Sequence, residues 1–143
     1  MKLPEQVRAF IRTSRVARMA TVDAARCPHI VPICYAYDGT RLYTVVDEKP
    51  KRVEPAMLRR LVNIRTNPRI CVIIDQYDED WSCLRFVMIH GTAGIEPAGA
   101  EHNRAIELLR KKYPQYQTMT LAEHVNPVIA ITPTKIVRWG IFE

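Results

Sequence analysis

A run of basic side chains stands out in the middle of the sequence. Lys49, Lys51 and Arg52 follow an apolar segment, and Arg59 and Arg60 come about two helical turns later. Cations near the first turns of a helix, where free backbone amides also favour negative charge, suit a phosphate group. The other interpretation is a solvated loop whose charges point into water, and the spacing alone leaves both open.

The length and the charge of the chain set broad limits. A chain of 143 residues has the size of one domain, so we expect residues 1–143 to fold as a single unit. Lys and Arg outnumber Asp and Glu by 21 to 15, which gives a net charge of +6 and an electropositive surface. The four cysteines lack CxxC spacing, and the chain starts without a secretory or lipidation signal. We therefore expect reduced thiols, a cytoplasmic location and no membrane span.

No other motif with a familiar chemistry occurs in the sequence. The four histidines lack metal-ligand spacing, and HExxH, GxGxxG, P-loop and nucleophilic-triad patterns are missing. The acidic residues at 75–80 are more typical of a solvated loop than of a metal site. We expect no metal, no nucleic acid as a partner, because no binding motif accompanies the basic residues, and we identify no catalytic side chain.

The elements that must position the basic run can be predicted from periodicity. Helical spacing of apolar residues occurs in residues 3–13, 53–67 and 100–113, with one or two further turns in 118–125. Strand patterns occur in residues 16–23, 28–38, 41–47, 69–75 and 84–96, and then in a strand pair at 128–142 that Pro133 interrupts at an edge or bend. Asp38-Gly39 indicates a hairpin. Because the strands cluster instead of alternating with helices, we predict a small, closed or partly closed barrel with helices outside it.

Several motifs occur in an order that is more distinctive than any one of them. They are PHIVPICYAYDG, LYTVVDEKPKR, LRRLVNIRTNPRICVIID, YDEDWS, KKYPQY and KIVRW. With them the chain resembles, from about residue 16 to 139, the pyridoxamine 5'-phosphate oxidase-like (PPOX) flavoproteins of the FMN-binding split-barrel type. It is most similar to the branch associated with the deazaflavin coenzyme F420. The resemblance implies a mainly β fold, a six-stranded antiparallel split barrel with helices, and a homodimer with a cofactor in each of two clefts between the subunits.

The same resemblance gives the basic run a role in cofactor binding. It implies that Lys49, Lys51 and Arg52 hold the phosphate of the cofactor's side chain. Arg59 or Arg60 is expected to reach the phosphate or a polyglutamyl tail. Charge-assisted hydrogen bonds of this kind contribute about 1.5–3 kcal/mol each, so the cluster is expected to supply much of the affinity.

Two strands and two tryptophans complete the expected site. The strand residues expected beside the tricyclic ring are Val31, Pro32 and Ile33 on one strand and Thr44, Val45, Val46 and Asp47 on the next. Trp81 and Trp139 are expected to line the cleft from the partner subunit, since an aromatic side chain beside a flavin buries a large apolar face. For Trp139, packing in the core is the alternative.

The expected activity is hydride transfer between F420 or FMN and a small organic substrate. Both cofactors end their ribityl chain in a phosphate, so the basic cluster does not separate them, and the branch resemblance favours F420. Alternatives are an FMN-binding relative of pyridoxamine 5'-phosphate oxidase and a cofactor carrier or sensor without turnover.

Overall fold

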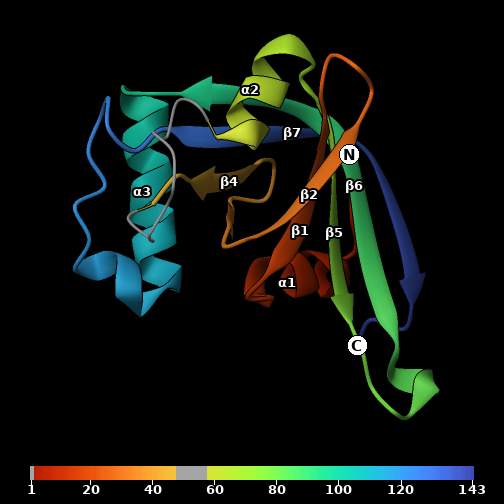
Figure 1. Cartoon of the computed structure of the whole chain (residues 1–143). Coiled ribbons are helices and arrows are strands. Elements are labelled where there is room, and N and C mark those ends of the chain that lie inside the picture. Colours follow the sequence, from red (N-terminus) through yellow and green to blue (C-terminus); the bar gives the residue numbers. More distant parts are fainter. Residues whose placement is uncertain (1, 48–57) are drawn as a thin grey trace.

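A computed structural model describes residues 2–47 and 58–143, and its centre is one antiparallel sheet with helices packed around it (Figure 1). The helices are α1 (Glu5–Thr13), α2 (Arg59–Thr66) and α3 (Ala100–Lys112), with short 3-10 turns η2 (Trp81–Cys83) and η3 (Pro114–Gln117). The strands are β1 (Ala17–Val22), β2 (Pro28–Ile33), β3 (Ala36–Tyr37), β4 (Leu42–Val45), β5 (Arg69–Gln76), β6 (Arg85–Glu96) and β7 (Val128–Gly140). These elements confirm the predicted split-barrel fold.

The sheet has seven strands in the order β2-β1-β5-β6-β7-β4-β3, one more than the six expected. Residues 28–38 were predicted as one strand and form two, β2 and β3. Between them, the backbone amide of Tyr35 donates to the hydroxyl of Tyr113 at 3.1 Å. The hydroxyl of Tyr35 is buried and donates to the carbonyl of Ile11. Tyr35 thus bonds to α1 and to the end of α3 instead of to a neighbouring strand, and the strand is interrupted there.

The C-terminal segment also differs from its prediction. Residues 128–140 form a single strand instead of a strand pair. Pro133 lies opposite Gly91, where the register of β6 and β7 shifts, so the proline is accommodated at a bulge. The helical turns expected in residues 118–125 reduce to one turn, closed by a 2.9 Å hydrogen bond from the amide of Asn126 to the carbonyl of Ala122.

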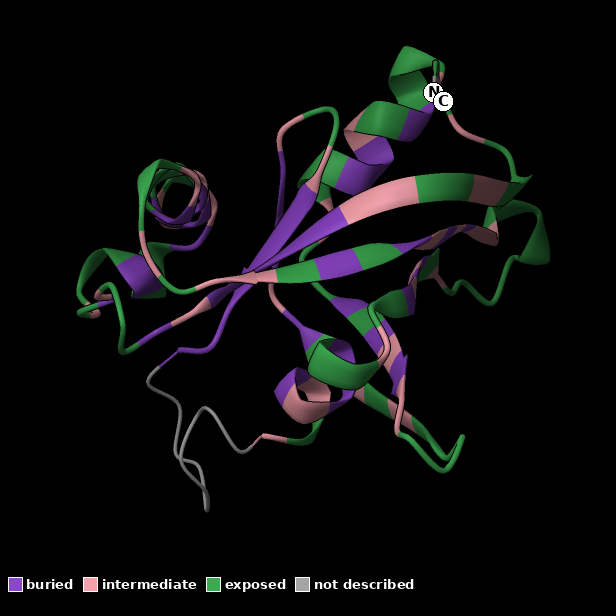
Figure 2. Cartoon of the chain, turned by 90° about the horizontal axis from the view of Figure 1, so that it is seen from above, coloured by how far each residue is buried: buried purple, intermediate pink, exposed green. Residues whose placement is uncertain are grey.

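Two clusters of buried side chains hold the elements together (Figure 2). In the larger cluster, Val7, Phe10 and Ile11 of α1 pack on the inner face of the sheet, as their helical spacing predicts. In the smaller one, Leu109 and other residues of α3 pack against β4 and β7. The four cysteines are free, as expected. Over residues 2–47 and 58–143, the helices are too short or too polar to cross a membrane.

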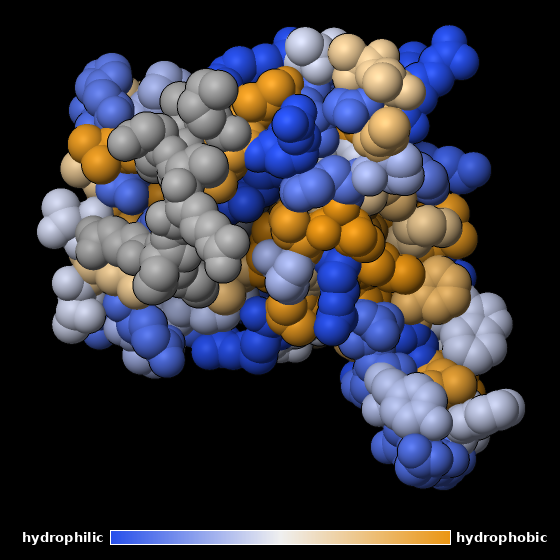
Figure 3. Space-filling model, in the orientation of Figure 1, coloured by the Kyte–Doolittle hydropathy of each residue, from blue (hydrophilic) through white to orange (hydrophobic). Residues whose placement is uncertain are grey.

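The other face of the sheet carries side chains that none of the described helices covers. Register places Ile73, Met88 and Val137 in one row across β5, β6 and β7, with Phe86 and Trp139 in the next row. All are half-buried or exposed, whereas the alternate positions Val72, Ile74, Val87 and Ile89 of β5 and β6 are buried. In Figure 3, apolar surface lies over the region of β1, β2 and β5, bordered by hydrophilic residues.

Candidate functional site

A cavity of about 420 Å³ lies between β2 and β4, the strands near opposite ends of the sheet order. Because the sheet curls, these two distant strands face each other without pairing. The cavity is lined by Val16, Val31, Pro32, Ile33, Cys34, Thr44, Val45, Asp47, Leu58, Arg60 and Tyr116. The lining is apolar on the β2 side and polar at Asp47, Arg60 and Tyr116.

The two strands present these residues for reasons visible in their sequences. β2 is the edge strand of the sheet, which tolerates Pro28 and Pro32 because no neighbour needs their missing amide hydrogens. β4 is buried at all four positions, because the main core covers one of its sides and the α3 cluster the other. Beyond β4, the ionisable residue Asp47 is only 7% exposed. A buried carboxylate needs partners that compensate for its lost hydration.

Asp47 is bonded to a tyrosine from a distant part of the chain. The hydroxyl of Tyr116 donates to Oδ2 of Asp47 at 2.7 Å. Burial, and then the hydrogen bond and charge of Asp47, raise the pKa of Tyr116 well above its ordinary value of 10.0. The tyrosine hydroxyl therefore remains protonated at physiological pH and acts as a donor to the carboxylate.

Arg60 supplies a cation to the same cavity from the first turn of α2. Burial lowers the pKa of its guanidinium from the ordinary 12.5, while the charges of Asp47 and Tyr116 act in the opposite direction. An arginine remains protonated under such a shift, so Arg60 is a half-buried positive charge. Its neighbour Arg59 is exposed and does not line the cavity. Leu61 and Ile64 are buried and fix the orientation of α2. This orientation leaves Arg59 exposed and Arg60 at the cavity.

The structure brings together most of the residues predicted for the site. Val31, Pro32, Ile33, Thr44, Val45, Asp47 and Arg60 all line the cavity. Val46 does not: its side chain is fully buried in the main core, and its carbonyl accepts a 2.9 Å hydrogen bond from Asn126. Lys49, Lys51 and Arg52 lie outside the described residues, so their phosphate contact stays a prediction.

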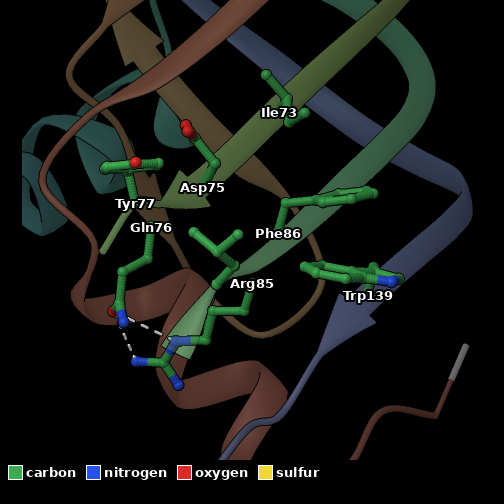
Figure 4. A pocket seen from close by; sticks show the side chains of 8 residues that line it. Ile73, Asp75, Gln76, Tyr77, Arg85, Phe86 and Trp139 are labelled. Atoms are coloured by element: carbon green, nitrogen blue, oxygen red, sulfur yellow. Dashed lines mark hydrogen bonds between the residues drawn. The ribbon is translucent and has the colours of Figure 1, made fainter. Parts of the chain in front are cut away.

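The two tryptophans are not part of this cavity within one chain. Trp81 is 70% exposed on η2. Trp139 is 53% exposed, and its ring stacks on Phe86 with centroids 6.0 Å apart, beside a second hollow at the far end of β5 and β6 (Figure 4). Trp139 is thus at the surface rather than in the core, and the contribution of either tryptophan to a partner's cleft stays a prediction.

Sequence reasoning missed four lining residues: Val16, Cys34, Leu58 and Tyr116. Tyr116 lies within the KKYPQY motif, so the motif marked its region without indicating its role. Its contact with Asp47 spans 69 residues and leaves no local pattern. Among the described residues, His, Cys, Asp and Glu side chains form no group of three that could hold a metal ion.

Comparison with known proteins identifies the class of this fold. Residues 3–139 match the sequence model of the family described as pyridoxamine 5'-phosphate oxidase, so the chain belongs to that family, as its motifs predicted. A 5a,11a-dehydrotetracycline/5a,11a-dehydrooxytetracycline reductase from Streptomyces rimosus is 27% identical over 133 residues, which cover 92% of this chain and 79% of the reductase.

Solved structures share the fold at lower identity. A conserved hypothetical protein from Mycobacterium tuberculosis superposes with a TM-score of 0.78 at 19% identity, covering 98% of this chain and 86% of that one. An F420 reductase superposes with a TM-score of 0.67 at 20% identity, covering 94% of this chain and 98% of the reductase. At these identities the superpositions establish the architecture of the chain.

Proposed function

We propose that this protein is an oxidoreductase that binds F420, or alternatively FMN, in the cavity between β2 and β4 and transfers hydride to or from a small organic substrate. The observation that carries the proposal is the division of the cavity into an apolar wall and a polar end that contains Arg60. Membership of the pyridoxamine 5'-phosphate oxidase family and the similarity to a tetracycline-type reductase support a redox role. The F420 reductase of the same fold supports the choice of the deazaflavin.

The cavity meets the requirements of such a cofactor. Its volume of about 420 Å³ falls within the range of roughly 300–1,000 Å³ that is usual for small-molecule sites. Val16, Val31 and Leu58 offer apolar contacts to a tricyclic ring. β2 is an edge strand of the described sheet, so its outer backbone groups have no partner among the described strands and can bond to the polar edge of the ring.

The roles of the protein's own groups follow from this arrangement. Arg60 attracts the phosphate, Asp47 accepts hydrogen bonds, and the apolar side chains exclude water from the ring. When bound, the cofactor supplies the redox chemistry, and the protein supplies position and electrostatics. We assign no side chain as proton donor, since solvent can serve.

We also propose that two copies pair through the uncovered face of the sheet. Ile30 and Trp139 on this face are 62% and 53% exposed, and Ile73, Met88 and Val137 are half-buried. An apolar surface of this kind is typical of an interface between subunits. Pro32 lines the cavity and stands opposite Arg18 in the β1–β2 register, next to this face, so pairing would bring the partner to the mouth of the cavity.

Titration of the purified protein with F420 and with FMN tests the proposal, with light scattering to give the mass of the free protein. We expect binding of at least one cofactor, with F420 preferred, and the mass of a dimer. Arg60→Ala is expected to weaken binding of the phosphorylated cofactor about tenfold or more, because it removes a charge-assisted hydrogen bond. Arg59→Ala, one position away and exposed, is the matched control and should bind as the wild type does.

Three outcomes would count against parts of this proposal. Failure of the wild type to bind either cofactor would refute it, and equal losses in the Arg59 and Arg60 variants would refute the assigned phosphate contact. Tight binding without reduction of any substrate in a broad panel would favour the carrier or sensor instead.

A further inference from the structure

We propose that Tyr116 is a positioning residue of the cofactor cavity, and that it holds the carboxylate of Asp47 where this group accepts hydrogen bonds from the hydroxylated chain of the ligand. This inference rests on the proposed function, because it concerns the same cavity. It adds a role for one residue: a tyrosine that orients the carboxylate facing the hydroxylated chain of the proposed cofactor.

The geometry of the pair places it at the cavity wall. Both residues line the cavity, Tyr116 is only 3% exposed, and its hydroxyl lies 2.7 Å from Oδ2 of Asp47. A buried carboxylate is costly unless donors compensate for its lost hydration. Tyr116 supplies such a donor from the protein side, so Asp47 is kept at the surface of a cavity where a ligand can reach it.

Tyr116 is itself fixed by contacts that do not involve the cavity. Its carbonyl accepts a 3.1 Å hydrogen bond from Nε of Arg110, whose Nη2 donates to the carbonyl of Met119 at 3.0 Å. Its ring packs edge-on against Tyr113, with centroids 5.6 Å apart and planes at 68°. The hydroxyl is therefore oriented by the end of α3 before any ligand binds, which is the condition for a preorganised contact.

The two charged groups of the cavity match the proposed cofactor. A carboxylate only accepts hydrogen bonds, and a guanidinium only donates them. A purely anionic ligand would meet repulsion from Asp47, and a ligand without an anionic group would make no use of the positive charge of Arg60. A ribityl phosphate satisfies both groups, because its hydroxyls can donate to Asp47 while its phosphate accepts from Arg60.

The test uses Tyr116→Phe, which removes the hydroxyl and keeps the ring. Binding is measured for three ligands of the series that the wild type prefers. The first is the full cofactor, FMN or F420. The second is the form that ends in ribityl hydroxyls, riboflavin or its deazaflavin counterpart, and the third is the ring with a methyl group in place of the chain, lumiflavin or its deazaflavin counterpart. We expect about tenfold weaker binding of the first two ligands and unchanged binding of the third.

Two further variants make the result specific. Tyr77→Phe removes a hydroxyl from an exposed residue that does not line this cavity, and it should leave all three affinities unchanged. Asp47→Asn should weaken binding of the ribityl form more than that of the full cofactor, because the loss of the negative charge also relieves repulsion of the phosphate. This second variant keeps the inference testable if Tyr116→Phe fails to fold.

The outcomes separate this inference from the proposed function. If the wild type binds the full cofactor but Tyr116→Phe leaves the ribityl ligand unaffected, the inference is overturned and the proposed function stands. An equal loss for the methylated ring would also overturn it, since it would indicate general disturbance of the cavity. If the wild type binds no member of either series, both proposals fall.

Discussion

Lys112, at the end of α3, offers a sharp test of how burial controls charge in this protein. Its ammonium Nζ is buried and has no hydrogen-bond partner among residues 2–47 and 58–143, which is unusual for a lysine. It lies 3.9 Å from the ring centroid of Tyr35 and 5.4 Å from that of Tyr113. Lys112→Met replaces the ammonium by an apolar group of similar length, so it removes the charge and keeps most of the packing.

The size of the effect follows from the pKa of Lys112. Burial, and secondarily the charge of Arg15, lower this pKa from 10.5 to about 8. At about 1.4 kcal/mol per pKa unit, this corresponds to an upper bound of roughly 3 kcal/mol against the charged form. The side chain is partly exposed, so solvent screening reduces the figure to about 1–2 kcal/mol. The cation–π contact opposes it by about 0.5–1 kcal/mol, and we expect Lys112→Met to raise the free energy of unfolding by about 1 kcal/mol at pH 7.

The pH dependence of stability provides a second test of whether the buried charge of Lys112 destabilises the folded protein. Between pH 8 and 10.5 the unfolded chain holds the proton of Lys112 more tightly than the folded protein does. The wild type should therefore gain stability as the pH rises through this interval, and the advantage of the variant should shrink. Urea unfolding followed by circular dichroism, at equal protein concentration and at several pH values from 7 to 10, measures both effects.

The exposed neighbour Lys111 provides the control. Lys111→Met should leave the stability and its pH dependence close to those of the wild type. A Lys112→Met protein that is less stable than the wild type at pH 7 would show that the aromatic contacts outweigh burial. A constant difference from pH 7 to 10 would refute the role of the proton.

Two further predictions concern the core. Tyr35→Phe leaves the carbonyl of Ile11 without its donor and should lower the free energy of unfolding by about 1–3 kcal/mol, measurable by urea unfolding; an unchanged midpoint would contradict the importance of this bond. Ile89→Ala, at a fully buried position of β6, should cost about 2–5 kcal/mol, seen as a fall in the thermal midpoint with native circular dichroism retained at 20 °C; a loss below about 1 kcal/mol would show that the core can collapse around the deletion.

Local pattern predicts much of this fold. The spacing of Val7, Phe10 and Ile11 predicts the buried face of α1, and Asp38-Gly39 predicts the hairpin, in which Gly39 adopts φ +96°. The break at Tyr35 could not be found in this way. It depends on the hydroxyl of Tyr113, which is 78 residues away in the sequence. The residues next to Tyr35 show only a continuous apolar segment.

The candidate site was predictable to a similar degree. The resemblance supplied the two strands and Arg60, because they belong to motifs with characteristic order. Tyr116 was not found, since its role depends on how η3 meets the end of β4. Val46 was expected at the ring, but its side chain is buried in the main core, whereas Thr44, Val45 and Asp47 line the cavity.

The curl of the sheet has a consequence for stability as well as for shape. The walls of the cavity belong to β2 and β4, which are far apart in the sheet order, so the cavity exists only once the whole sheet has rolled up. A molecule bound there would contact both strands and hold them together. Because it binds only the folded form, it would raise the free energy of unfolding by an amount that grows with the logarithm of its concentration above the dissociation constant.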